Sequence, residues 1–137
     1  MQRILVAVDG LPGSAKALEV AVEHAQMKGG RVTALAVVDR SGDPILERMA
    51  DDARKRARGQ LEEILQAAVN FARTRGVQLT PALREGHPAD AIVTCAEQEA
   101  AELVVLGSHN GTCRRPGLGG TADQVCNHAP CAVMIVR

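Results

Sequence analysis

The segment RILVAVDG (residues 3–10) decides the fold of this chain. Its five apolar residues, from Ile4 to Val8, follow one another with no polar residue between them. A strand of this pattern is buried on both faces, which is typical of a parallel sheet covered by helices. Asp9 and Gly10 come directly after it and indicate a turn. We therefore predict a buried strand over residues 3–9 whose carboxyl end carries a carboxylate.

Similar apolar runs recur along the whole chain, and amphipathic stretches separate them. Further strands are predicted at 31–39, 77–86, 102–107 and 131–137, and helices at 14–28, 47–75, 87–100 and 121–129. This alternation predicts a single α/β domain over residues 1–137. It forms a three-layer sandwich, a five-stranded parallel sheet with helices on both faces, because right-handed crossovers place the helices there. Pro81 favours an edge position for the third strand.

The composition argues against several classes of function. The 137 residues include 16 basic and 16 acidic side chains, so no net field attracts nucleic acid or an anionic membrane. Phe71 is the sole aromatic residue, which leaves no stacking platform for single-stranded nucleic acid. No segment has the apolar length of a membrane span or of a signal-peptide core. The four cysteines are too sparse for a disulfide framework, so we expect reduced thiols and a cytoplasmic location.

A glycine-rich segment, VVLGSHNGTCRRPGLGGTADQV (residues 104–125), follows the fourth predicted strand. Its glycines lack the spacing of a P-loop, and it contains no lysine. In open parallel sheets, ligands bind beyond the carboxyl ends of the strands, where the winding direction switches. The polar turn at Asp9 and Gly10 also lies at such an end. If the first and fourth strands are neighbours, both features border one crevice.

The chain resembles the universal stress proteins over essentially its whole length. The resemblance lies in ILVAVDG at the start, REGHPADAIVTCAEQEAAELVVLGSHNG in the middle and GGTADQVCNHAPCAVMIVR at the end. It implies a sheet order of 3-2-1-4-5, which makes the first and fourth strands neighbours. Members that bind ATP carry the motif G-x2-G-x9-G-[ST]. In this chain the motif positions are Gly107, Asn110 and Gly120-Thr121.

The resemblance also implies an adenine-nucleotide site with ATP and Mg²⁺ as cofactors. Ala7, Val8 and Asp9 would lie by the nucleoside, with Asp9 near the ribose or the metal. Val37 would pack beside the adenine, and Leu106 and Gly107 would line the base and ribose. The phosphates would lie on Gly120, Thr121 and Ala122, with Asn110 and Gly111 in the loop before them. Family members commonly form homodimers through the last strand, here Ala132–Arg137.

Asn110 replaces the second glycine of the motif. Asparagine tolerates a left-handed backbone better than other non-glycine residues, but it adds a side chain where the ATP-binding members leave room. Gly111 follows it, one residue out of register. Arg114 and Arg115 are second-rank candidates, either as charge-assisted donors to phosphate or as a solvated pair in the loop.

Two of the candidate residues also have purely structural interpretations. Thr121 and Gln124 have the spacing of a capping box, although the first amides of a helix also bind anions. Asp9 either accepts hydrogen bonds from the turn that follows it or contacts a ribose hydroxyl or a metal ion, because a carboxylate at a strand end needs partners.

Two further groups of residues are expected to be structural. His109 with Cys113, and Cys126 with His128 and Cys131, lack the spacing of a structural zinc site. We expect Cys126 on the inner face of its helix and Cys113 to be the exposed thiol. The charged run 47–58 offers the ion pairs Asp51–Lys55 and Asp52–Arg56; it is either a solvated helix face or a flap over the crevice.

These patterns favour a small ATP-binding protein with a regulatory role. The first alternative is a member of the same family that holds no nucleotide and acts through protein contacts, which Asn110 favours. The second is a slow ATP hydrolase. No catalytic residues are predicted, because Ser108 and His109 are adjacent and lack a third partner, and DGLPGS (residues 9–14) differs from the SGGxDS loop of the related pyrophosphatase-type enzymes.

Overall fold

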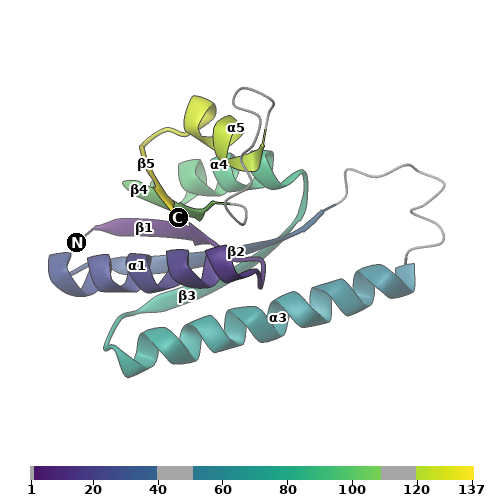
Figure 1. Ribbon diagram of the computed structural model, residues 1–137, viewed down its shortest axis with the longest axis horizontal. Helices are drawn as coiled ribbons and strands as arrows, with labels where there is room; N and C mark the ends of the chain where they lie inside the picture. The colour runs from purple at the N-terminus through teal and green to yellow at the C-terminus, as the bar shows by residue number, and fades with distance from the viewer. Residues whose placement is uncertain (1, 40–50, 109–119) are drawn as a thin grey trace.

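The computed structural model describes residues 2–39, 51–108 and 120–137, which form one parallel sheet between two layers of helices (Figure 1). All five strands run parallel, in the order β3-β2-β1-β4-β5. The elements are β1 Arg3–Ala7, α1 Pro12–Lys28, β2 Arg31–Asp39, α3 Asp51–Thr74, β3 Leu79–Gly86, α4 Pro88–Gln98, β4 Leu103–Gly107, α5 Thr121–His128 and β5 Ala132–Val136. The predicted fold class and strand order are confirmed.

Two apolar clusters fill the space between the sheet and its helices. One lies under α1 and α3, and the other lies under α4 and α5. This division follows from the strand order, because right-handed crossovers from β1 through β2 to β3 place both helices on one face. The chain then returns to β4 beside β1 and continues in the opposite direction, so its next two helices lie on the other face. The winding direction therefore switches between β1 and β4.

Small residues let α1 lie close to the sheet. Its buried residues are Ser14, Ala17, Ala21, Val22 and Ala25. Such a helix face has little side-chain volume, so the helix backbone approaches β1 and β4 closely. Contacts of this kind gain dispersion energy but tolerate no added volume.

The predicted helix boundaries agree with the structure to within about two residues, except that the predicted start at residue 47 lies outside the described residues. Gly29 ends α1 in the left-handed conformation, with a φ of 70°, and Gly76 follows α3 with the same φ. Both positions suit glycine because it has no Cβ to clash there. Pro88 occupies the first turn of α4 as predicted, and β3, which contains Pro81, is an edge strand as predicted.

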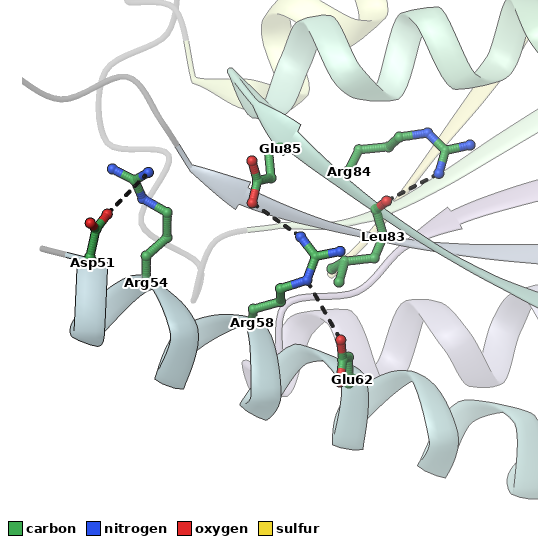
Figure 2. Close-up of polar contacts among 7 residues, drawn as sticks. All are labelled: Asp51, Arg54, Arg58, Glu62, Leu83, Arg84 and Glu85. Atoms are coloured by element: carbon green, nitrogen blue, oxygen red, sulfur yellow. Dashed lines mark hydrogen bonds and ion pairs between the residues drawn. The ribbon is translucent and has the colours of Figure 1, made fainter. Parts of the chain in front are cut away.

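The charged residues at the start of α3 lie on the exposed side of that helix, and the helix packs on the same face of the sheet as α1. The observed ion pairs are Arg54–Asp51 at 3.9 Å, Arg58–Glu62 at 3.6 Å and Arg58–Glu85 at 3.1 Å (Figure 2). Neither predicted i,i+4 pair, Asp51–Lys55 or Asp52–Arg56, is among the ion pairs of the described residues. Arg54, one turn from Asp51, pairs with that carboxylate instead. The last pair joins α3 to the end of β3.

No helix in the described ranges combines the length and apolarity needed to cross a bilayer.

The inner face of α5 is narrower than predicted. Val125 is fully buried, and Ala122 and Ala129 are half-buried against the same cluster. Cys126 is exposed, so its predicted inward position is wrong. The helix has 8 residues. Ala122, Val125 and Ala129, at positions i, i+3 and i+7, already make its contact with the apolar cluster. Cys126 follows Val125 and therefore lies a further 100° around the helix, off this face.

Candidate functional site

The carboxyl ends of β1 and β4 lie side by side at the switch point. Val6 pairs with Val105 in the register of these two strands. On its other side, β1 pairs with β2 as far as Ala7 and Leu35, and the N–H of Val8 donates to the carbonyl of Leu35 at 2.8 Å. β2 then continues to Asp39 beside β3. β2 therefore extends beyond the end of β1 at this edge of the sheet, from Leu35 to Asp39. We call this offset the step.

Val37 presents two main-chain groups at this step. The N–H and C=O of one strand residue point to the same side, and alternate residues share that side. Because Leu35 faces β1, Val37 faces the same way, where β1 has already ended. Among the described residues, neither group of Val37 has a hydrogen-bond partner on this side. The step therefore offers one donor and one acceptor beside each other.

The turn between β1 and α1 holds the carboxylate of Asp9 in place. One oxygen of Asp9 accepts the N–H of Leu11 at 2.9 Å. The N–H of Asp9 donates to the hydroxyl of Ser14 at 3.2 Å, and that hydroxyl donates to the carbonyl of Leu11 at 3.1 Å. Gly10 has a φ of 83° in this turn, which suits glycine. The structural interpretation of Asp9, a carboxylate that accepts a hydrogen bond from the following turn, is confirmed.

Two glycines bring α1 into direct contact with the end of β4. A Cβ on Gly107 would overlap the carbonyl group of Gly13 and lie 2.9 Å from the N of Ser14. A Cβ on Gly13 would lie 2.6 Å from the carbonyl oxygen of Ser108. The first glycine of the motif therefore serves the packing of two backbones. The sequence analysis missed Gly13. Glycine destabilises a helix relative to alanine, so its presence in the first turn of a predicted helix is a signal that another backbone approaches closely there.

The start of α5 lies at the same edge of the sheet. Gly120 is the N-cap residue, with φ −63° and ψ 160°, and no side chain caps the helix. Thr121 is the first helical residue, so the predicted capping box with Gln124 is wrong. The first helical hydrogen bond runs from the N–H of Gln124 to the carbonyl of Gly120 at 3.1 Å. The N–H groups of Thr121, Ala122 and Asp123 thus have no partner within the helix.

The predicted site residues divide between the two faces of the sheet. Leu106 belongs to the apolar cluster under α4 and α5, and Ala7, Val37 and Ala122 pack against that cluster. Side chains from four elements therefore lie in or against one apolar cluster on this face of the sheet. Val8 belongs to the opposite cluster, so its side chain lies away from the other predicted residues. The predicted Asn110, Gly111, Arg114 and Arg115 lie outside the described residues, as do His109 and Cys113.

The described cysteines have different surroundings. Cys95 is buried, Cys131 is half-buried and Cys126 is exposed. Burial raises the pKa of the Cys95 thiol, the charge of Glu99 raises that pKa further, and Arg84 opposes the shift. Burial also raises the pKa of Cys131. Within the described ranges, no group of three or more histidine, cysteine or acidic side chains could hold a metal ion.

Iodoacetamide is expected to alkylate Cys126 at least about tenfold faster than Cys95 in the folded protein at pH 8. The thiolate is the reacting species, and burial both blocks access to Cys95 and keeps it protonated. Mass spectrometry of the digested protein would measure both rates. In denaturing urea the two rates should become similar. Equal rates in the folded protein would contradict the burial of Cys95.

Comparisons with known proteins agree with this fold. The model of the universal stress protein family matches residues 1–137. A universal stress protein from Thermus aquaticus is 32% identical over 136 residues, which cover 98% of this chain and 97% of that protein. The structure of universal stress protein UspA from Lactobacillus plantarum has a TM-score of 0.86 at 29% identity, and the match covers 99% of this chain and 97% of the other. A universal stress protein from Archaeoglobus fulgidus, solved in complex with dAMP, has a TM-score of 0.73 at 26% identity, with 100% and 98% covered.

Proposed function

Because the chain belongs to the universal stress protein family, we propose that it binds an adenine nucleotide at the step between β1, β2 and β4, in a regulatory role. The observation that carries this proposal is the pair of main-chain groups on Val37, whose side chain packs against the apolar cluster under α4 and α5. The structurally similar protein from Archaeoglobus fulgidus was solved with dAMP, which supports the same class of ligand for this chain.

The main-chain groups of Val37 suit the edge of adenine. Adenine carries an acceptor at N1 and a donor at its 6-amino group. The N–H of Val37 would donate to N1, and its carbonyl would accept from the amino group. The half-buried side chains of Ala7 and Val37 pack against one apolar cluster and would provide an apolar surface for the base. Leu106 is buried within that cluster, at 4% exposure, and would support this surface from below.

The start of α5 suits the phosphates. The amides of its first turn have no intrahelical partner and lie at the positive end of the helix dipole. Gly120 has no side chain to occupy them. The carboxylate of Asp123 also lies in this first turn and partly offsets the attraction for anions. We therefore assign the phosphate contacts to main-chain amides rather than to a charged side chain.

ATP and Mg²⁺ are a narrower form of the same proposal. Asp9 has one carboxylate oxygen engaged by Leu11, which leaves the other for a ribose hydroxyl or for a metal ion carried by the phosphates. The described residues provide no metal-binding group of their own. Mg²⁺ would therefore bind together with ATP rather than before it, and slow hydrolysis of ATP would be a secondary property.

A homodimer through β5 accompanies this proposal. β5 is an edge strand, and Ile135 is 37% exposed on it. An unpaired apolar edge favours association with a second strand. The partner we propose is a second copy of this chain, through Ala132–Arg137.

Isothermal titration calorimetry is expected to show binding of AMP and about 10- to 100-fold weaker binding of IMP. Hypoxanthine carries N1–H and a 6-oxo group, so it presents a donor and an acceptor in the reverse order to adenine. Both main-chain groups of Val37 would then face groups of the same kind as themselves. Titration of ATP with and without Mg²⁺ would test the narrower proposal.

Equal affinity for AMP and IMP would contradict the assignment of the base to Val37. If neither AMP nor ATP binds, the alternative of a family member that acts through protein contacts would replace the proposed function. Nucleotide recovered from the purified protein by acid extraction would support the proposal independently of any added ligand.

A further inference from the structure

The part of β2 that carries Val37 is supported by a neighbouring strand on one side only. β1 ends beside Leu35, so no described strand lies next to residues 36–39 on that side. On the other side these residues pair with β3, in a register that continues to Asp39 and Gly86. We call residues 36–39 the overhang. A group that holds the end of β3 in place therefore also supports the overhang.

Arg58 of α3 lies beyond the end of β1. It precedes the buried Leu65 by two turns, so both side chains lie on the face of the helix that is turned to the sheet. A Cβ on Gly10 would lie 2.6 Å from the Cδ1 of Ile64, so Ile64 is level with the turn after β1. α3 leads the chain back from the carboxyl edge of the sheet, and Arg58 stands about 9 Å before Ile64 along its axis.

The guanidinium of Arg58 lies between two carboxylates (Figure 2). Its Nη1 donates a hydrogen bond to Oε1 of Glu85 at 3.1 Å, and its Nε lies 3.6 Å from Oε1 of Glu62. Glu62 belongs to α3 itself, whereas Glu85 belongs to β3 and pairs with Val38 of the overhang. The contact with Glu85 therefore joins α3 to the pair of strands that carries Val37.

We propose that Arg58 is a positioning residue for the base-binding end of the nucleotide site. It acts through Glu85, because the ion pair fixes the end of β3 and β3 holds the overhang in the conformation that presents the main-chain groups of Val37. This inference rests on the proposed function and adds to it a residue that makes no contact with the ligand. Without the ion pair, the overhang has more conformations in the free protein, and binding must order it at a cost in affinity.

The substitution Glu85→Gln tests this role by removing the charge that Arg58 contacts. The ratio of the affinities for AMP and IMP, measured by isothermal titration calorimetry, is expected to fall about two- to fivefold, the range for a partly exposed ion pair. AMP loses affinity because it uses the main-chain groups of Val37, which IMP does not match. The two ligands carry the same charge, so the loss of a nearby carboxylate affects both alike. A general loss of stability also cancels in the ratio.

Glu62→Gln is the matched control, because it removes the other carboxylate beside Arg58 by the same chemical change. The contact between Glu62 and Arg58 lies within α3, so this variant is expected to keep the ratio of the unaltered protein. A fall of similar size in both variants would overturn the inference.

Arg58→Met provides the reciprocal variant of the pair. It is expected to lower the ratio as much as Glu85→Gln does, and the double variant should lower it no further. Fully additive effects of the two substitutions would contradict the claim that Arg58 acts through Glu85.

Hydrogen exchange without nucleotide tests the positioning step by itself. Val37 faces the side of β1, so the N–H of Val38 faces β3, and its exchange rate reports opening of the overhang. Glu85→Gln is expected to raise this rate about two- to fivefold, and Glu62→Gln should leave it unchanged. An unchanged rate in Glu85→Gln would overturn this inference alone. Failure of the unaltered protein to bind AMP would overturn the proposed function and, with it, the role of Arg58 in binding.

Discussion

Gly107→Ala is expected to lower the free energy of unfolding by about 3 kcal/mol, which is a large share of the stability of a domain of this size. The new Cβ would overlap the carbonyl group of Gly13 and lie 2.9 Å from the N of Ser14. These neighbours are all backbone atoms of α1, so no side chain can rotate away. The helix must move off the sheet, and its buried alanine face then loses contact. Thermal unfolding should show a melting temperature about 10 °C lower.

Gly59→Ala is the matched control for this prediction. Gly59 lies within α3, and a Cβ there would meet nothing within 4 Å. Alanine stabilises the middle of a helix by about 0.5–1 kcal/mol relative to glycine, so this variant is expected to unfold at a slightly higher temperature. The two substitutions are chemically identical, but their effects on the free energy of unfolding should have opposite signs. A stability of Gly107→Ala equal to that of the unaltered protein would contradict the close contact between α1 and β4.

The elements of this fold are predictable because local patterns specify them. The uninterrupted apolar run from Ile4 to Val8 indicates a strand covered on both faces, and the structure buries it between the two layers. Gly29 and Pro88 mark a helix end and a helix start through backbone conformations that depend on a single residue. Local patterns do not specify the strand order, because the alternation of strands and helices alone leaves several orders open. The order follows instead from the family resemblance.

Two of the errors arise because several partners compete within one helical turn. Thr121 has the right spacing for a capping box, but Gly120 takes the N-cap position. Asp51 pairs with Arg54 rather than Lys55, because both lie within one turn. The contact between Gly13 and Gly107 joins residues from distant parts of the chain, so a glycine in the first turn of α1 signals a close approach there but does not identify its partner. Val8 lies on the opposite face from Ala7 because successive side chains of a strand alternate, so a site that includes both side chains ignores this local rule.

Thr121→Pro is expected to weaken AMP binding about 10- to 100-fold while α5 still forms. Proline removes one main-chain N–H, and a hydrogen bond to a charged group contributes about 1.5–3 kcal/mol. The helix tolerates proline at its first position, where no intrahelical bond is lost. Two other helices of this chain already begin with Pro12 and Pro88. Gly120 has φ −63° and ψ 160°, the extended conformation that a residue before proline prefers.

Thr121→Ala separates the main-chain amide from the side chain in this test. Alanine keeps the N–H and removes the hydroxyl, so its affinity for AMP should stay close to that of the unaltered protein. Adenosine should bind both variants alike, because it lacks the phosphate that the amide would contact. Equal weakening by alanine and proline would assign the phosphate contact to the hydroxyl of Thr121. AMP binding unaffected by proline, with α5 intact by circular dichroism, would exclude this amide as a phosphate ligand.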